Sequence, residues 1–405
     1  MECASHLLEI AQSTLAACRF EKDCRYYGAE RRLPVFLPAG DDKYPSFWVR
    51  DCAMSSLSGL MADDDLLHYI EYIALCGQNG PEPRALQHAL RVPPFAVADH
   101  INYNGRPVFF PGTYSDGDDQ GQGAFGFYPP LDDNYWFILM AAQYVRQTGD
   151  RAVLRRDYAG MALGERLTRA WAGYCIDPKT GLCTGDDRRY VVDWGFCDSI
   201  HKSGLMLMPS LLRRQAALAL QEMGLMGDGT ARAQRIDESI LSNLYDPESG
   251  WFYSASRICR QWDVWSTAYA VSIGVLDGRT QALGRTRKAL ETAFIRRTAV
   301  EHGYVRQLLL SCDPPYWQSK GPGGGYQNED YWSTPTGWYY AALKPQAPEL
   351  AQALMEEFIR HTWRHRELGA PFEFINRDMS RYSGCVYATS AALPYAEYMR
   401  MNAVP

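Results

Sequence analysis

The sequence lacks several features that mark large classes of proteins. None of its 405 residues belongs to an apolar run approaching the roughly 18–20 residues of a membrane span, so we expect no membrane segment. The first twenty residues interrupt their apolar character with Glu2, His6 and Glu9, unlike a secretion signal. The 11 cysteines are scattered, without a CxxC pair or zinc spacing. Buried thiols in a reducing compartment explain this best, and we expect a cytoplasmic protein without metal or other cofactor.

A basic excess is also lacking. Lys and Arg number 41 against 47 Asp and Glu, which gives a formal net charge of -6, and no basic patch is evident along the chain. This balance argues against nucleic acid or an anionic membrane surface as partner. The sequence says nothing about the oligomeric state.

Aromatic residues, by contrast, are abundant. Phe, Trp and Tyr together make up 13% of the sequence, and 26 of these residues are Tyr and 11 are Trp. Such rings fill an aromatic core or line a site where flat apolar faces meet a polar ligand. Sugars suit the second role, because their C–H faces stack on rings while their hydroxyls need hydrogen bonds. A small carbohydrate is therefore the partner that we expect.

Helical periodicity dominates the chain and alternates between two kinds of helix. Every second predicted helix is small and apolar on all sides, which is typical of a helix buried on all sides, and its neighbours carry charges on one face. Six inner and six outer helices predict an all-α fold, the (α/α)6 toroid, with short β-hairpins in loops such as 106–110 and 188–192. The predicted helices are 2–19, 49–62, 64–77, 132–148, 150–172, 204–224, 229–245, 264–275, 279–292, 330–343, 346–363 and 384–400.

No linker or low-complexity stretch divides the chain, so residues 1–405 are expected to form one catalytic domain. Residues 78–131 are the longest non-helical insertion, rich in Pro, Gly and Asp, and long loops of this kind are usually functional. We place this insertion at the rim of the active site. Residues 321–325 (Gly-Pro-Gly-Gly-Gly) have neither the preceding strand nor the following Lys-Ser/Thr of a phosphate loop, and predict a second rim segment.

Acidic and aromatic residues recur together in the loops that lead into the inner helices. In a toroid these loops converge at one end of the axis. Helix N-capping explains a single Asp at such a place, but it gives no reason for the tryptophans. The six segments are 47–51 (Phe-Trp-Val-Arg-Asp), 129–136 (Pro-Pro-Leu-Asp-Asp-Asn-Tyr-Trp), 192–198 (Val-Asp-Trp-Gly-Phe-Cys-Asp), 261–265 (Gln-Trp-Asp-Val-Trp), 327–332 (Gln-Asn-Glu-Asp-Tyr-Trp) and 371–376 (Pro-Phe-Glu-Phe-Ile-Asn).

Convergent carboxylates beside aromatic platforms suit the cleavage of a glycosidic bond. One carboxylic acid protonates the leaving oxygen, and a second carboxylate activates water or attacks the anomeric carbon. Further acids and arginines fix the sugar ring through its hydroxyls.

Four short motifs resemble those of the six-hairpin glycosidases, the superfamily of glucoamylases, trehalases and processing α-glucosidases. Residues 48–51 resemble their W-x-R-D signature, and residues 331–338 (Tyr-Trp-Ser-Thr-Pro-Thr-Gly-Trp) are similar to their Y-W-x-x-P-x-x-W segment. Residues 372–376 followed by 388–392 (Ala-Thr-Ser-Ala-Ala) resemble their C-terminal pair. The motifs occur in the expected order over residues 48 to 395.

The resemblance implies an inverting mechanism. Glu373 matches the base that activates water. Arg50 and Asp51 match the pair of residues that binds the sugar at the non-reducing end. The competing interpretation of that pair is a buried structural ion pair. For the general acid, Asp193 is the first candidate and Asp198 the second.

The remaining candidates are substrate-binding residues. A third possible acid, Glu329, is one of them, although it could simply cap a helix. Trp338 is expected to face Trp48 and the Arg50–Asp51 pair across the innermost subsite. The full set is Trp48, Arg50, Asp51, Asp132, Asp133, Trp136, Trp194, Glu329, Trp332 and Trp338.

The sequence thus predicts an exo-acting, inverting glycoside hydrolase for an α-linked small oligosaccharide or glycoside. A phosphorylase of related architecture is one alternative, against which the presence of Glu373 argues. A sugar epimerase is another, but it would need paired histidines, and the histidines do not cluster in the loops before the inner helices. An inert carbohydrate-binding protein would keep the tryptophans without catalysis.

Overall fold

The computed structural model describes residues 2–26, 28–41, 43–123, 125–189, 191–309 and 325–403. Of the predicted rim segment 321–325, only Gly325 lies within the described residues. The described helices are α1 Glu2–Ala17, α2 Val49–Ser56, α3 Asp63–Tyr72, α4 Asp133–Thr148, α5 Leu163–Ala172, α6 Leu207–Glu222, α7 Gly229–Asn243, α8 Val264–Ser272, α9 Thr280–Ile295, α10 Thr336–Leu343, α11 Pro348–His365 and α12 Ala388–Asn402.

The described strands are short, except for the first two. They are β1 Arg19–Tyr26, β2 Ala29–Phe36, β3 Phe47–Trp48, β4 Arg84–Ala85, β5 Arg91–Val92, β6 His100–Ile101, β7 Pro107–Val108, β8 Asp157–Tyr158, β9 Met161–Ala162, β10 Thr184–Gly185, β11 Gly204–Leu205, β12 Val300–Glu301, β13 Tyr304–Arg306, β14 Tyr331–Trp332 and β15 Phe374–Ile375.

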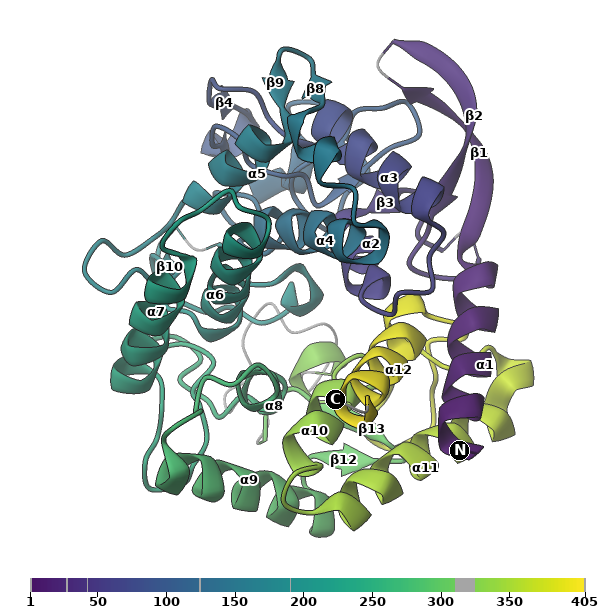
Figure 1. Cartoon of the computed structure of the whole chain (residues 1–405), viewed down its shortest axis with the longest axis vertical. Helices are drawn as coiled ribbons and strands as arrows, with labels where there is room; N and C mark the ends of the chain where they lie inside the picture. Colours follow the sequence, from purple (N-terminus) through teal and green to yellow (C-terminus); the bar gives the residue numbers. More distant parts are fainter. Residues whose placement is uncertain are drawn as a thin grey trace.

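The even-numbered helices contact one another in a closed cycle. α2 packs against α4, α4 against α6, and so on through α8, α10 and α12 back to α2. The odd-numbered helices lie outside this cycle and pack against its members (Figure 1). The chain therefore has the α-rich fold expected from the sequence, and each of the twelve described helices falls within or close to a predicted segment.

Burial separates the two sets of helices as the sequence pattern predicts. Every residue of α2 and of α10 is buried, whereas the outer helix α9 buries only Thr286, Leu290, Ala293 and Phe294. A helix surrounded by other elements must present apolar or small side chains on all sides. The inner helices thus form the core, and the loops that precede them are held in place by it.

Local pairing corrects several predicted boundaries. The segment 150–172 begins with a short 3-10 turn, in which Asp150 accepts N–H bonds from Ala152 and Val153, and continues through the β8–β9 hairpin before α5 starts. α10 starts six residues later than predicted because Tyr331 and Trp332 pair as a strand with β13 and β15. Of the predicted strand at 188–192, the described residues 188, 189, 191 and 192 belong to no strand, and Val191 makes one isolated bridge to Gly126.

The β1–β2 hairpin was not predicted. Its eight-residue strands pair along their whole length, from Arg19 opposite Phe36 to Tyr26 opposite Ala29. β1 alternates exposed and less exposed side chains, the period-two pattern of a strand, which its many charges obscure in the sequence.

Two small sheets lie beside the loops that carry the candidate site. One is formed by β3, β6 and β7, and the other by β12 to β15 in sequence order. No described helix combines the length and the hydrophobicity needed to cross a membrane. The ten cysteines among the described residues are all free thiols.

Candidate functional site

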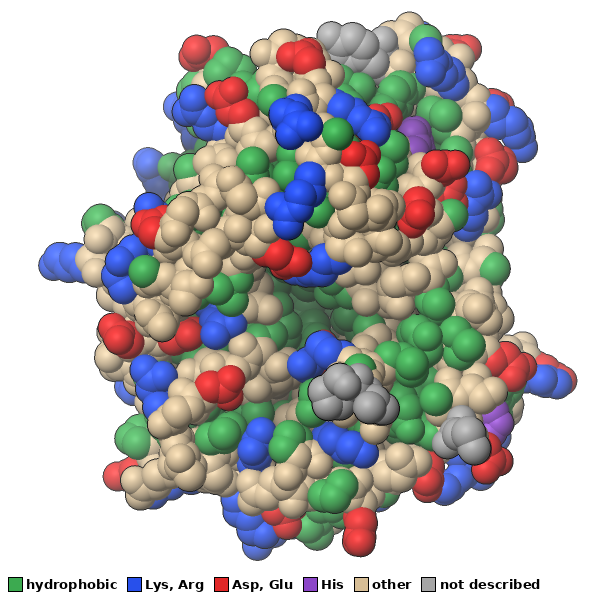
Figure 2. Space-filling view, viewed as in Figure 1, with side chains coloured by type: hydrophobic (Ala, Val, Ile, Leu, Met, Phe, Trp, Pro, Cys, Tyr) green, Lys and Arg blue, Asp and Glu red, His purple; other side chains and the backbone are tan. Residues whose placement is uncertain are grey.

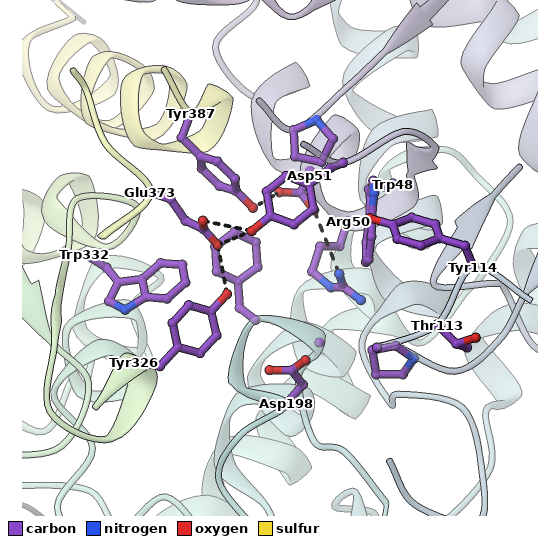
Figure 3. A pocket seen from close by; sticks show the side chains of 16 residues that line it. Trp48, Arg50, Asp51, Thr113, Tyr114, Asp198, Tyr326, Trp332, Glu373 and Tyr387 are labelled. Carbon is purple, nitrogen blue, oxygen red and sulfur yellow. Dashed lines mark hydrogen bonds and ion pairs between the residues drawn. The ribbon is translucent and has the colours of Figure 1, made fainter. Parts of the chain in front are cut away.

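A cavity of about 200 Å³ lies where the loops before α2 and α12 meet the segment 195–198 and the strand β14 (Figure 3). The insertion 78–131 contributes residues 111–114 to its wall. The lining residues are Pro38, Tyr44, Trp48, Arg50, Asp51, Pro111, Gly112, Thr113, Tyr114, Gly195, Phe196, Asp198, Tyr326, Trp332, Glu373 and Tyr387.

Glu373 is held in this cavity by hydrogen bonds to both of its carboxylate oxygens. The Tyr44 hydroxyl lies 2.9 Å from each oxygen, and the Tyr326 hydroxyl donates to Oε1 at 2.9 Å. Lys43 Nζ lies 3.2 Å from Oε2. Burial raises the pKa of both tyrosines, so they remain protonated donors. These contacts fix the orientation of a side chain that is only 3% exposed.

Asp51 lies beside Glu373 on the same wall, as Figure 3 shows. The Tyr387 hydroxyl donates to Asp51 Oδ1 at 2.8 Å, and Arg50 Nη1 lies 3.8 Å from Oδ2. Burial raises the pKa of Asp51 to about 7, although Arg50 and the Tyr387 hydrogen bond act in the opposite direction. Asp51 can therefore exchange a proton near neutral pH.

Arg50 is buried at the centre of four carboxylates. Its Nε lies 3.2 Å from Asp132 and its Nη2 lies 3.4 Å from Asp133, while Nη2 also pairs closely with Asp99. Burial opposes the charge of Arg50, but Asp133, Asp99 and the other carboxylates raise its pKa well above the usual value. Asp132 and Asp133 thus lie behind Arg50 and do not line the cavity.

The segment that carries Asp198 is packed directly onto Arg50. A Cβ at Gly195 would overlap the Arg50 guanidinium, so only glycine fits there without movement. The Gly195 N–H donates to Asp132 Oδ1 at 3.1 Å. On the other side, Gln327 Nε2 donates to the Phe196 carbonyl and lies 3.4 Å from Asp198 Oδ1. These contacts hold Asp198 at the cavity wall.

Asp193, the first candidate for the general acid, does not line the cavity. It lies 2.7 Å from Lys202 Nζ in an ion pair whose side chains are each 1% exposed. Burial raises the pKa of Asp193, and the carboxylates of Asp193 and Asp263 raise that of Lys202 against its own burial. The raised pKa that the acid role required is present, but on a group enclosed in the core.

The predicted tryptophans divide among three places. Trp48 and Trp332 line the cavity, and Trp48 stacks at 4.3 Å on His100. Trp194 is buried with Phe196 stacked on it at 5.2 Å and Trp265 edge-on at 5.7 Å. Trp136 and Trp338 line a different hollow, so Trp338 does not face Trp48 across the cavity as expected.

That second hollow, of about 810 Å³, is lined mainly by the later turns of inner helices, together with Trp136 and Trp338 near the starts of α4 and α10 and Arg287 of α9. Figure 2 shows a central hollow with hydrophobic side chains on its floor. Trp194 contacts both Trp338, at 5.9 Å, and Trp265, which in turn contacts Trp332 at 5.7 Å. This chain of packed rings separates the hollow from the cavity.

The third acid candidate, Glu329, also lies outside the cavity lining. Arg377 Nη1 donates to its Oε1 at 3.1 Å, and the Gly325 N–H lies 3.4 Å from its Oε2. Glu329 therefore connects Gly325 and Arg377 and does not face the cavity.

Sequence reasoning missed the residues that hold the carboxylates, namely Tyr44, Tyr326, Tyr387, Gln327 and Lys43. Tyr387 directly precedes α12, as Trp48 precedes α2. The rule that selected the other loop residues would have selected it, had the helix not been predicted to start at residue 384. Tyr44 lies four residues before Trp48, just outside the segment 47–51 that the sequence singled out. No signal in the sequence distinguished Lys43.

Among the described residues, no group of three or more His, Cys, Asp or Glu side chains is placed to hold a metal ion. Chemistry without a metal stays a prediction from the sequence.

No family model matches the chain, and no curated protein matches its sequence. Solved structures do match it along nearly its whole length. A rhamnosidase from Klebsiella oxytoca with rhamnose bound matches with a TM-score of 0.59 and 14% identity, over 99% of this chain and 64% of the rhamnosidase. The chain thus spans less than two thirds of that protein.

Two further matches cover other enzyme types. Cellobiose 2-epimerase from Bacillus thermoamylovorans matches with a TM-score of 0.61 and 8% identity, over 98% of each chain. Hormoconis resinae glucoamylase matches with a TM-score of 0.58 and 12% identity, over 99% of this chain and 73% of the glucoamylase. The chain shares the fold of these structures, and the resemblance to the six-hairpin glycosidases is confirmed at the level of fold.

Proposed function

We propose that the chain is a carbohydrate-active enzyme, and specifically a glycoside hydrolase that inverts the anomeric centre. The single observation that carries this proposal is the meeting of Glu373 and Asp198 at one small cavity that also contains Trp48 and Trp332. Two carboxyl groups and stacking rings are what the hydrolysis of a glycosidic bond requires. The closed cycle of inner helices supports the (α/α)6 toroid as the fold that carries them.

In this proposal Glu373 is the general base. Tyr44 and Tyr326 donate to its oxygens and so orient the carboxylate toward a water molecule. A base held in this way can accept a proton from a water molecule at one position, and inversion requires that this water attack the anomeric carbon from the face opposite the leaving group. The reaction needs a separation of about 6.5–9.5 Å between base and acid, to leave room for the water.

Asp198 is the general acid that we propose, in place of Asp193. It lines the cavity, whereas Asp193 is enclosed with Lys202. The contact from Gln327 orients the Asp198 carboxyl for proton transfer to the leaving oxygen.

The size of the cavity supports exo action on a small α-linked oligosaccharide or glycoside. A volume of about 200 Å³ suits one sugar ring rather than several. Arg50 and Asp51 close its inner end, and we propose that Asp51, assisted by Tyr387, binds the hydroxyls of the terminal sugar.

A sugar epimerase is the second candidate, since the epimerase structure matches end to end without additional length. Its chemistry would require histidine in the site, and none of the described lining residues is a histidine. His100 lies behind Trp48 and pairs with Asp99 at 2.8 Å.

The test is a panel of α-glycosides, including α-rhamnosides and α-glucosides, with the first-formed anomer of the product read by NMR. A product of inverted configuration supports the proposal, and a retained configuration contradicts it. Turnover that requires phosphate identifies a phosphorylase. Isomerisation of a free disaccharide, with deuterium taken up from D₂O, identifies an epimerase, and sugar binding without any turnover identifies a binding protein.

A further inference from the structure

A second concave surface lies on the outer helix α9 and has the charge that the chain as a whole lacks. It is a groove of about 970 Å³ bounded by α9, residues 249–251, residues 296–298 and the end of β13. Its described lining includes five Lys or Arg side chains and no Asp or Glu, in a chain of net charge -6. The five are Arg285, Lys288, Arg296, Arg297 and Arg306.

No basic patch is evident along the sequence because these residues are spread over 22 positions and interleaved with Glu291 and Glu301, neither of which lines the groove. Residues 288 and 296 follow residue 285 by three and eleven positions, about one and three helical turns. On a helix these three residues therefore lie on one face. Ala289 and Ala293 lie between them and line the groove. Their small side chains leave a channel along the helix, about 16 Å long from residue 285 to residue 296 at 1.5 Å per residue.

Carboxylates outside the groove partly compensate the charges of Lys288 and Arg297. Lys288 Nζ lies 2.8 Å from Glu291, and Arg297 donates to Glu357 at 2.5 and 2.7 Å. Arg285 donates to the main-chain carbonyl of Pro247. Within the part of the chain that the structure describes, neither Arg285 nor the exposed Arg296 forms an ion pair with a carboxylate. The groove therefore keeps a net positive potential, and this favours an anionic ligand.

The floor of the groove is formed by a buried guanidinium. Arg306 is 9% exposed and packs 5.8 Å from the Tyr331 ring. Arg306 is paired with Tyr331 across β13 and β14, and the next pair is Val305 with Trp332. Since successive side chains of a strand point to opposite faces, Arg306 faces the groove while Trp332 faces the candidate active site. The two surfaces are distinct, but they share this strand pair.

Neutral polar groups accompany the charges. Ser249, Gln281, Thr292 and Thr298 line the groove together with the small exposed part of Trp251, which is 4% exposed. Hydroxyl and amide side chains beside an aromatic ring suit sugar hydroxyls, while the cations suit carboxylate or sulfate groups. We propose that this groove binds an acidic oligosaccharide that carries uronate carboxylates or sulfates along its length. The preference for a sugar over other polyanions rests on the proposed function; the preference for an anion does not.

The test measures binding to the full chain by isothermal titration calorimetry, so that it needs no turnover. The probes are an oligogalacturonate, a sulfated oligosaccharide of the same length, neutral maltohexaose and a single-stranded DNA of equal charge. We expect one of the two acidic sugars to bind and its affinity to fall as salt rises, and we expect no binding of maltohexaose. The sugar that binds tells carboxylate from sulfate recognition.

The double variant Arg285→Glu/Arg296→Glu should weaken this binding at least about tenfold, because two attractive charges become repulsive. Arg91→Glu/Arg155→Glu is the matched control. It makes the same change in net charge at exposed positions on β5, which pairs with β4, and just before β8. Since β4 and β8 lie far from α9 (Figure 1), it should leave the affinity unchanged. Thermal melting checks that each variant is folded, and Arg285→Gln/Arg296→Gln replaces the reversed pair if that pair unfolds.

Three outcomes would overturn the proposal: no binding of either acidic sugar at low salt, equal weakening by the control pair, or tighter binding of the DNA. A chain that hydrolyses glycosides but binds neither acidic sugar refutes the groove and leaves the proposed reaction standing. A chain that binds an acidic sugar in the groove but hydrolyses no glycoside refutes the proposed reaction and leaves the groove standing.

Discussion

The two hollows at the ends of the inner helices differ in how their charged groups are held. In the cavity of about 200 Å³, the side chains of Glu373, Asp51 and Arg50 are each at most 3% exposed and have several hydrogen-bond or ionic partners. In the hollow of about 810 Å³, the Arg146–Glu222 pair is 41% and 47% exposed. The charges of the smaller space are therefore held rigidly, whereas the larger space combines this water-screened pair with more shielded charges such as Arg214, which is 11% exposed.

The direction of the inner helices accounts for this division. Their N-terminal ends adjoin the cavity, where Arg50 and Asp51 lie in the first turn of α2 and Tyr387 directly precedes α12. The positive end of a helix dipole stabilises carboxylates, and the negative end stabilises arginines. At the opposite end, Arg214 and Arg400 donate to the carbonyls of Ile273 and Ser272, next to the C-terminus of α8. Of these two hollows, the one that we propose as the active site has the smaller volume.

The largest expected effect is that of Glu373→Gln. The amide cannot accept a proton from water, so kcat should fall roughly 10³-fold or more, while the melting temperature should stay close to that of the wild type. Steady-state kinetics on a responsive glycoside and a melting curve measure both. An active Glu373→Gln variant would contradict the base assignment.

Asp198→Asn and Asp193→Asn separate the two acid candidates. The first should lower kcat by about 10²-fold or more on a substrate with a poor leaving group, and much less on an aryl glycoside whose leaving group needs no proton. The second breaks a buried ion pair, which typically costs about 3–5 kcal/mol of stability. If Asp193→Asn instead melts normally and shows the dependence on leaving group, the acid role belongs to Asp193.

Asp51 gives the fold a pH dependence of defined sign. Its pKa is raised from an ordinary value of 3.8 to about 7 in the folded chain, so the folded state binds more protons than the unfolded state between these values. The stability that protonated Asp51 contributes is complete below pH 4 and is lost as the pH rises through 7. A shift of this size corresponds to something on the order of 4 kcal/mol.

Chemical denaturation of the wild type and of Asp51→Asn at pH 4.5 and at pH 8 checks this. The variant should gain stability relative to the wild type as the pH rises. A difference that stays constant with pH, or that moves in the other direction, would show that Asp51 is ionised throughout.

Gly195→Ala tests how closely the segment 195–198, which carries the proposed general acid Asp198, packs against Arg50. The added methyl group overlaps the guanidinium, and overpacking of this kind costs about 1–3 kcal/mol. It should also lower turnover by displacing Asp198. Gly284→Ala is the matched control, since a Cβ there meets nothing within 4 Å on helix α9; it should stabilise the chain slightly. Normal stability and turnover in Gly195→Ala would mean that the loop has room to move.

The sequence predicted the helical architecture well because the period and the inner–outer contrast are local properties. Arg50, Asp51, Asp198 and Glu373 were among its candidates because each lies within three residues of an aromatic residue, in or next to a loop that leads into an inner helix. Arg50, Asp51 and Glu373 also match motifs of the six-hairpin glycosidases. The sequence could not tell Asp198 from Asp193, because only the packing shows that Lys202 encloses one and Gln327 orients the other.

The tryptophans show a second limit. Trp332 and Trp338 are six residues apart in one motif, yet Trp332 lines the cavity and Trp338 lines the opposite hollow. Trp332 is on strand β14, before the helix, whereas Trp338 is inside α10. The boundary of α10 decides between the two ends, and strand pairing with β13 and β15, which involves distant residues, sets that boundary.

The smallest effect is expected at the opposite hollow, from Arg146→Ala. Its ion pair with Glu222 is exposed to water on both sides, so its loss should cost less than about 1 kcal/mol and leave kcat/KM unchanged. The same substitution at Arg50 leaves Asp99, Asp132 and Asp133 buried without their cation, and should cost about 3–5 kcal/mol and abolish turnover. Melting curves and steady-state kinetics of these two variants compare the ends directly. If Arg146→Ala lowers turnover while the chain melts normally, the hollow takes part in the function, and the division between a reactive and an inert end is wrong.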